Sequence, residues 1–270
     1  MGMIFIGERI NGGFKDIVKA IKEKDKDIIK KWAIRQTRAG ADYIDVNIGA
    51  VSNKVKDYIW MIETVQETVP TPISIDTNKL EFVKEALKLC QKTPLINSTT
   101  AHDEKLDQLV PLAVEHGVGL IGVCMDEKGS PQDVNRRVEL AAKIFTHAVE
   151  KGLPPERLFL DPVIMPLKFL QPQATSVLEA IDQFKLLSDP PPHIVVGLSN
   201  ISSQTLELEL INRTFLVMAI EAGLDAAICD VTDTELVNAA ITAELIKGEH
   251  IYSDSFIKAY QAAKKPGVGD

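Results

Sequence analysis

Short apolar runs alternate with longer amphipathic stretches along the chain. The apolar runs are rich in Ile, Val and Leu and lack strict alternation, which is typical of strands buried on both faces of a parallel sheet. They span residues 3–6, 43–48, 73–76, 95–98, 119–125, 158–161, 194–198 and 226–230. The amphipathic stretches predict helices, and they cover residues 26–39, 55–68, 80–90, 104–116, 132–151, 176–187 and 207–222.

Eight such strands, separated by helices and without an intervening linker, predict an α/β fold. The arrangement expected is a single (β/α)8 TIM barrel over residues 1–270. A doubly wound sheet is the alternative, and it usually carries a glycine-rich phosphate loop after its first strand. The chain reads GERING at that place, which does not match G-x-G-x-x-G.

Residues that favour helix ends agree with this alternation. Glycine follows four of the helical stretches, where a left-handed residue commonly ends a helix. Residues that favour N-caps stand at three places where helices are expected to begin. The predicted C-terminal glycines are Gly40, Gly117, Gly152 and Gly223, and the predicted N-caps are Asp103, Ser130 before Pro131, and Asp233.

The composition excludes several classes of protein. A net charge of −8 argues against nucleic acid as the main partner. No apolar run approaches the roughly 18 residues of a membrane span, and MGMIFIGERING is expected to form a strand, not a signal peptide. Cys90, Cys124 and Cys229 form no pair at close spacing, which favours reduced thiols and a cytoplasmic location. The five histidines show no metal-ligand spacing, so no metal is expected, and residues 262–270 are expected to fray.

Polar residues follow nearly every predicted strand, and in a barrel these strand ends meet at one mouth. They are mostly Asp and Asn, with few Lys, His or Cys, so the site offers hydrogen-bond acceptors and little nucleophilic power. A flat neutral heterocycle with several N–H donors, such as a pterin, complements it. Any single residue of this kind can instead be a turn former. Four that converge from different strands are Asp76, Asn97, Asp161 and Asn200.

Several segments together resemble one enzyme family over residues 3 to 260. They are IGERING, DVNIG, SIDTN, INSTTA, PLAVEHG, LDPVIMP, VVGLSNIS, LINRTFL and AGLDAAICD. The chain resembles the methyltetrahydrofolate:corrinoid/iron-sulfur protein methyltransferases. This family includes the folate domain of cobalamin-dependent methionine synthase and methyltransferase components of anaerobic demethylase systems. The resemblance implies a dihydropteroate-synthase-like barrel, a homodimer, and an enzyme of one-carbon metabolism that binds methyltetrahydrofolate and docks a corrinoid protein over its mouth.

The same resemblance implies roles for individual residues. Asp76 in SIDTN, Asn97 in INST and Asp161 in LDP would hold the edge of the pterin. Asn200 in GLSN would approach N5 and act as the catalytic residue, while Asn11 and Asp45 belong to the site by less distinctive motifs. The family often has Gln and Arg in the loop after GLSN. Ser203 and Leu208 stand there instead, which leaves open how the glutamate tail of the folate is held.

The expected reaction moves a methyl group between N5 of tetrahydrofolate and the cobalt of the corrinoid. Co(I) is a strong nucleophile, so the protein has to activate N5 by a hydrogen bond or a proton. Asn200 is expected to swing toward N5 and stabilise the charge that develops there. The chain has no D-x-H-x-x-G motif, since the comparable place reads HIVVG, so the corrinoid is expected on a partner protein. The sequence leaves the preferred direction open.

Three other functions are alternatives to this one. Dihydropteroate synthase shares the barrel, but it uses a Lys after strand seven and an Arg-x-His near the C-terminus, where this chain has Asn200 and Ser253–Phe256. A phosphosugar lyase or isomerase would need a glycine-rich phosphate loop, and residues 199–204 contain no glycine. A non-catalytic pterin-binding subunit stays open, because the expected catalytic groups are also the binding groups.

Overall fold

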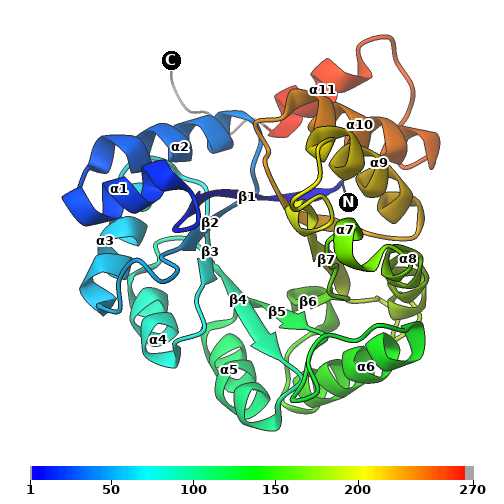
Figure 1. Cartoon of the computed structure of the whole chain (residues 1–270), viewed down its shortest axis with the longest axis horizontal. Helices are drawn as coiled ribbons and strands as arrows, with labels where there is room; N and C mark the ends of the chain where they lie inside the picture. Colours follow the sequence, from blue (N-terminus) through cyan, green and yellow to red (C-terminus); the bar gives the residue numbers. More distant parts are fainter. Residues whose placement is uncertain (1, 265–270) are drawn as a thin grey trace.

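Eight parallel strands close into a barrel with helices around it in the computed structural model, which describes residues 2–264 (Figure 1). Neighbours in the sheet follow chain order, and the last strand pairs with the first, so the sheet has no edge. This closure confirms the predicted (β/α)8 barrel and excludes the doubly wound sheet. The strands are β1 (Ile4–Asn11), β2 (Tyr43–Asn47), β3 (Ile73–Asp76), β4 (Leu95–Thr100), β5 (Gly119–Val123), β6 (Leu158–Asp161), β7 (His193–Gly197) and β8 (Ala226–Cys229).

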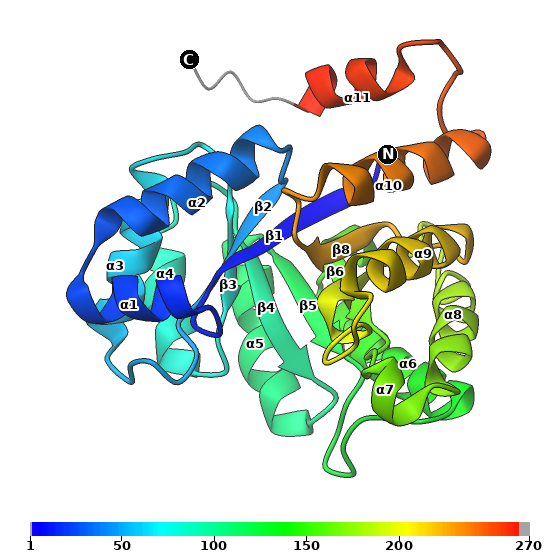
Figure 2. The ribbon, with the colours of Figure 1, turned by 45° about the horizontal axis from the view of Figure 1, so that its top comes forward.

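The helices form the outer ring of the barrel, and α11 lies beside α10 beyond that ring (Figure 2). Short 3-10 turns, Pro155–Arg157 and Leu198–Asn200, precede β6 and follow β7. The helices are α1 (Lys15–Glu23), α2 (Lys26–Arg38), α3 (Val55–Gln66), α4 (Leu80–Leu89), α5 (Asp103–His116), α6 (Val134–Glu150), α7 (Leu167–Leu170), α8 (Gln173–Phe184), α9 (Leu208–Glu221), α10 (Thr234–Ile246) and α11 (Phe256–Lys264).

Most of the predicted helix ends are confirmed. The four predicted C-terminal glycines all have positive φ, between 62° and 111°. Asp233 caps α10, because its Oδ1 accepts hydrogen bonds from the backbone N–H groups of Glu235 and Leu236.

Two predicted N-caps are wrong. Asp103 is the first residue of α5, and His102 occupies the capping position without a side-chain bond. Helix α6 begins at Val134, and its cap is Asp133, whose Oδ1 accepts from the Arg136 N–H at 2.9 Å. The hydroxyl of Ser130 instead points to the sulfur of Met125, so a nearer carboxylate takes the capping role.

The interior of the barrel determines which side chains reach its mouth. One buried residue from each of six strands (β1 and β4 to β8) belongs to a cluster that fills the interior: Ile6, Leu95, Ile121, Phe159, Val195 and Ala226. Side chains alternate between the two faces of a strand, so the residue two positions further on points the same way. Ile6 therefore directs Glu8 into the mouth, and by the same rule Leu95 directs Asn97 and Phe159 directs Asp161. The core of the barrel thus sets the orientation of the strand-end residues.

The structure also bears on what the composition predicted for the cysteines, for membrane spans and for the C-terminal tail. The three cysteines are free thiols, and burial raises the pKa of Cys124 and Cys229. Between residues 2 and 264, no helix is both long enough and apolar enough to cross a membrane. Residues 262–264, at the start of the tail expected to fray, belong to α11, and the Nζ of Lys264 lies 2.6 Å from Oδ2 of Asp42. Residues 265–270 lie outside the described part of the chain.

Candidate functional site at the barrel mouth

Polar side chains from four neighbouring strands meet at the C-terminal end of the barrel. The sheet register pairs Asn11 with Asn47, Asn47 with Asp76, and Asp76 with Asn97. Asp161, on β6, pairs with Val123 of β5 and lies further round the same mouth. The register therefore brings together residues that are far apart in the sequence.

Hydrogen bonds beneath this layer hold the two amide side chains in fixed orientations. Oδ1 of Asp45 accepts from the Ser74 hydroxyl at 2.6 Å and from Nδ2 of Asn97 at 3.1 Å. Nδ2 of Asn47 donates to Oδ2 of Asp76 at 2.6 Å, and its Oδ1 accepts from the Gly49 N–H at 2.6 Å. Because both amide nitrogens face carboxylates, the oxygen of Asn97 is left for another donor.

Two oxygen acceptors at the mouth have no hydrogen-bond partner among the described residues. They are Oδ1 of Asn97 and Oδ2 of Asp161, whose other oxygen accepts from the Val163 N–H at 2.8 Å. Neither is a fully enclosed atom, so both are accessible to a bound molecule. The Asp76 carboxyl lies between them on β3, where it accepts from Asn47 and is hydrogen-bonded to Asp45. We call the side-chain oxygens of Asp76, Asn97 and Asp161 the acceptor row. It suits a ligand that presents several N–H groups along one edge.

Burial raises the pKa values of three carboxyl groups at the mouth. It raises the pKa of Asp161 to about 6, and the charge of Arg137 partly opposes that rise. Burial also raises the pKa of Asp45 well above its ordinary value, and the neighbouring Asp76 carboxyl adds to it. The pKa of Asp76 is raised by burial as well. Carboxylates in such surroundings gain from ligand N–H groups that replace lost water.

The segment after β6 is held in place by a fully buried arginine. Nε of Arg137, on α6, donates to the Pro162 carbonyl at 3.0 Å, and one of its terminal nitrogens donates to the Val163 carbonyl at 3.3 Å. Val163 has a φ of 66°, a left-handed conformation that costs roughly 1–3 kcal/mol for a β-branched residue. Arg137 thus maintains the turn that directs Asp161 into the mouth.

Asn200 stands apart from the acceptor row. It ends the 3-10 turn after β7, its side chain is exposed, and its amide has no partner within residues 2–264. A β-carbon placed on Gly197 would lie 2.9 Å from Nδ2 of Asn200. The missing side chain at Gly197 therefore makes room for the amide.

Asn11 is at the mouth, but its side chain has a local role. Its Oδ1 accepts from the Gly13 N–H at 2.9 Å and closes the turn after β1. The next residue, Gly12, passes so close to β2 that an added β-carbon would lie 2.4 Å from the Ile48 carbonyl oxygen. The two loops are thus packed backbone against backbone.

The sequence did not single out another pair at the mouth, Glu8 and Ser199. The Ser199 hydroxyl donates to the carboxylate of Glu8, with oxygen–oxygen distances of 2.7 and 2.9 Å. Burial raises the pKa of Glu8 to about 7. Both residues are near strand ends, which the sequence shows, but no local pattern indicates that they contact each other. Asn47 and Ser74 were not predicted either, because their hydrogen-bond partners lie on neighbouring strands.

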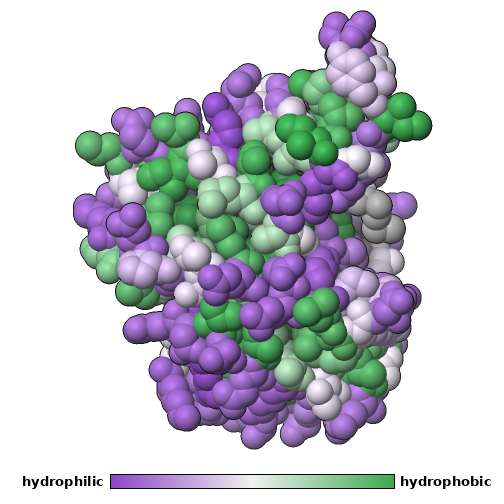
Figure 3. All heavy atoms as spheres, turned by 90° about the vertical axis from the view of Figure 1, so that its right-hand side faces the viewer, coloured by the Kyte–Doolittle hydropathy of each residue, from purple (hydrophilic) through white to green (hydrophobic). Residues whose placement is uncertain are grey.

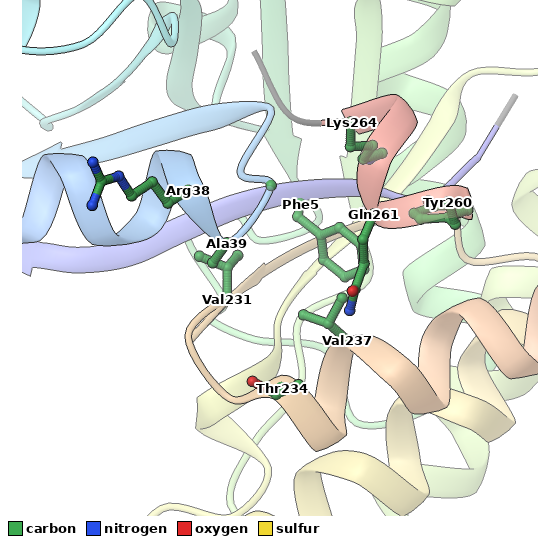
Figure 4. Close-up of a pocket in the computed structure, with 10 residues that line it drawn as sticks. Phe5, Arg38, Ala39, Val231, Thr234, Val237, Tyr260, Gln261 and Lys264 are labelled. Atoms are coloured by element: carbon green, nitrogen blue, oxygen red, sulfur yellow. The ribbon is translucent and has the colours of Figure 1, made fainter. Parts of the chain in front are cut away.

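Elsewhere the molecule offers weaker candidates for a site. Residues 2–264 contain no group of three or more His, Cys, Asp or Glu side chains placed to hold a metal ion. A cavity of about 220 Å³ lies on the flank of the barrel, and its lining includes Phe5, Val237, Arg38 and Tyr260 (Figure 4). It is lined by none of the predicted site residues, so the mouth is the candidate site.

Comparison with known proteins agrees with this geometry. The family model described as pterin binding enzyme matches residues 8–230. The methylcorrinoid:tetrahydrofolate methyltransferase of Eubacterium limosum is 33% identical over 265 residues, which is 97% of each chain. Methionine synthase of Mycobacterium leprae (strain TN) is 26% identical over 239 residues, covering 84% of this chain and 20% of that protein.

A solved structure shares the fold. Dihydropteroate synthase from Thermus thermophilus superposes with a TM-score of 0.68 at 20% identity, over 91% of this chain and 94% of that one. At this identity the likeness describes the barrel, not the reaction.

Proposed function

The chain belongs to the pterin-binding enzyme family, and from that premise we propose that it transfers a methyl group between N5 of tetrahydrofolate and the cobalt of a corrinoid. The acceptor row is the observation that carries the proposal, because it matches the N–H-rich edge of a pterin. The relative from Eubacterium limosum, similar over nearly its whole length, supports the choice of reaction. A dihydropteroate synthase would require cations for its leaving group, and Asn200 and the mouth carboxyls do not provide them.

Asp76, Asn97 and Asp161 would bind the pterin. The N3–H and 2-amino groups of the ring are donors, and the acceptor row offers oxygens from β3, β4 and β6 to receive them. Asp45 contributes indirectly, by holding the Asn97 amide through the 3.1 Å bond to its nitrogen. Asn11, whose oxygen closes its own turn, would border the ring through backbone and the remaining amide nitrogen.

Asn200 would act at N5. Its unpaired, exposed amide can rotate toward a bound ring, and as a neutral group it can donate to N5 without holding a charge of its own. A preorganised donor of this kind typically lowers a barrier by about 2.7–4 kcal/mol. The corrinoid supplies the cobalt that accepts or delivers the methyl group. The protein then needs only to bind the pterin and control charge at N5.

A partner protein would bring the corrinoid to the mouth. Five exposed apolar side chains border this end of the barrel, and we call them the apolar rim: Met165, Phe169, Leu206, Leu208 and Leu210. They lie on the segments that follow β6 and β7, which are joined because the Leu167 N–H donates to the Ile201 carbonyl at 2.9 Å. Leu206 is 97% exposed and Phe169 is 64% exposed. Such a patch beside a site is typical of a protein-binding surface.

A second copy of the chain would cover another surface. The flank formed by α8 to α11 exposes hydrophobic side chains among hydrophilic ones (Figure 3). Val217 and Met218 on α9 and Ile251 and Tyr252 after α10 contribute to it. This flank supports the homodimer, which light scattering of the purified protein would test. The free thiols are consistent with the expected cytoplasmic location.

The test is an anaerobic optical assay with purified protein and a free corrinoid. Methyltetrahydrofolate with cob(I)alamin tests one direction, and tetrahydrofolate with methylcobalamin tests the other. Turnover that is lost in Asn200→Ala would support the proposal. Tight folate binding without turnover, even with a corrinoid protein, would favour a pterin-binding subunit, and absence of folate binding would overturn the assignment.

A further inference from the structure

Glu8 and Asn200 approach the mouth from the same side of the barrel. Glu8 is on β1, which pairs with β8, and β8 pairs with β7, the strand that leads into the turn carrying Ser199 and Asn200. The Ser199 hydroxyl, 2.7 Å from the nearer Glu8 oxygen, connects the two elements directly. The acceptor row lies on strands β3, β4 and β6. Glu8 is therefore the titratable group joined to the turn that carries the N5-directed amide.

Burial and the charges around Glu8 place the pKa of its carboxyl near neutral pH. Burial and the Asp230 carboxyl at the end of β8 raise its pKa, while the Ser199 hydrogen bond and Arg9 lower it, giving about 7. Arg9 points away, because its guanidinium stacks 3.8 Å from the Phe14 ring and 4.1 Å from the Trp32 ring. Cys229, also near Glu8, keeps its proton because burial raises its pKa. Arg9 lowers the Glu8 pKa only from a distance, and within residues 2–264 no cation forms an ion pair with Glu8 that would lock it in the charged form.

We propose that Glu8 takes up and returns the proton that N5 exchanges during methyl transfer, a role that rests on the proposed function. When tetrahydrofolate accepts a methyl group, the N5 lone pair forms the new N–C bond. The Co–C bond breaks, and its electron pair stays on cobalt. The proton of N5 passes to the Glu8 carboxylate. In the opposite direction the carboxylic acid returns the proton to N5 as the N–C bond breaks, so no further reactant is required.

The other residues of the mouth are less suited to this task. Asn200 is an amide and cannot hold a proton near neutral pH. Asp76 and Asp161 belong to the acceptor row, where they would be occupied with the pterin edge. Ser199 serves as a positioning residue: its hydroxyl donates to Glu8 and stabilises the carboxylate form. A group with a pKa near the working pH is the most effective proton carrier in both directions.

The test is the pH profile of kcat for Glu8→Gln, Ser199→Ala and the matched surface variant Glu221→Gln, measured with a free corrinoid between about pH 5.5 and about pH 8.5. In wild type, methylation of tetrahydrofolate should rise through about pH 7, and demethylation should fall through it. Glu8→Gln should lose this inflection and about 100-fold in kcat, while folate binding is retained. Ser199→Ala should move the inflection to higher pH. Glu221→Gln should resemble wild type.

The outcomes separate this inference from the function on which it rests. If wild type turns over neither with a free corrinoid nor with a corrinoid protein, the proposed function fails. If wild type turns over and Glu8→Gln keeps the same inflection, only the role of Glu8 is overturned. An inflection that stays in place in Ser199→Ala would also contradict it, and this readout does not depend on the stability of the Glu8 variant.

Discussion

Nδ2 of Asn97 lies 3.1 Å from Oδ1 of Asp45, across the mouth of the barrel from β4 to β2. The same oxygen accepts from the Ser74 hydroxyl on β3, the strand between them, at 2.6 Å. One buried carboxyl thus fixes the amide of Asn97 and turns its oxygen toward the mouth. The proposed binding surface for a pterin therefore depends on a residue that need not touch the ligand.

Replacing Asp45 with Ala should weaken methyltetrahydrofolate binding about tenfold, because the Asn97 amide loses the partner that orients it. Asp45→Asn is the matched control, since its side-chain oxygen can still accept from Asn97 and Ser74. Isothermal titration calorimetry gives both affinities. Equal affinities in the two variants would show that the orientation of Asn97 does not depend on Asp45.

Gly197→Ala should lower methyl transfer at least tenfold, because the new β-carbon would lie 2.9 Å from Nδ2 of Asn200 and displace the amide. The fold should persist, since Asn200 is exposed and its side chain can move away. The rate is measured in the free-corrinoid assay. In the Asn200→Ala background the same glycine change should have little further effect, because the two act on one interaction. Additive losses would mean that Gly197 acts elsewhere.

Arg137→Met should lower the free energy of unfolding by about 2–5 kcal/mol, because buried backbone carbonyls lose a charged donor. Loss of the guanidinium charge should also raise the pKa of Asp161 above about 6 and weaken folate binding near neutral pH. Arg137→Lys keeps the charge, so the pH dependence of binding should stay close to wild type. Denaturant unfolding and affinity measured against pH provide the two readouts, and an unchanged pH dependence in Arg137→Met would contradict the coupling.

Glu8→Gln should change stability in a pH-dependent way. The pKa of Glu8 rises from 4.5 to about 7 on folding, so its favourable contribution is complete below about pH 4.5 and is lost as pH rises through about 7. The free energy of unfolding of the variant should therefore rise relative to that of wild type across that pH window, by up to about 3 kcal/mol. Denaturant unfolding near both ends of the window measures this, with Glu221→Gln as control. If the difference in free energy of unfolding between the variant and wild type does not change with pH, burial does not raise the pKa of Glu8.

Leu206→Ser should raise the KM for a methylated corrinoid protein several-fold, because it removes an apolar side chain that is 97% exposed at the mouth. The reaction with a free corrinoid should be unchanged. Leu186, on another part of the surface and 81% exposed, offers the matched control Leu186→Ser. If both variants behave alike, the apolar rim is not the partner surface.

The sequence by itself determined the barrel and much of its mouth. Segments rich in Ile, Val and Leu, such as residues 158–161 and 194–198, form strands that are buried on both faces. Their composition was therefore sufficient to predict them as strands of a parallel sheet. The positive φ values of Gly117 and Gly223 likewise follow from local steric limits. Asp76, Asn97 and Asp161 could be placed at the mouth because strand ends in such a barrel converge.

Only the tertiary structure decided which polar atoms are paired and which remain free. Asn47 and Asp76 are 29 residues apart, Asp45 and Asn97 are 52 apart, and Glu8 and Ser199 are 191 apart. These contacts depend on register and on closure of β8 against β1, which no local pattern encodes. The same competition among neighbours gave the N-cap of α6 to Asp133 in place of Ser130. Composition specifies the elements because their formation is local, whereas the pairing of polar atoms follows from the distances that folding sets between them.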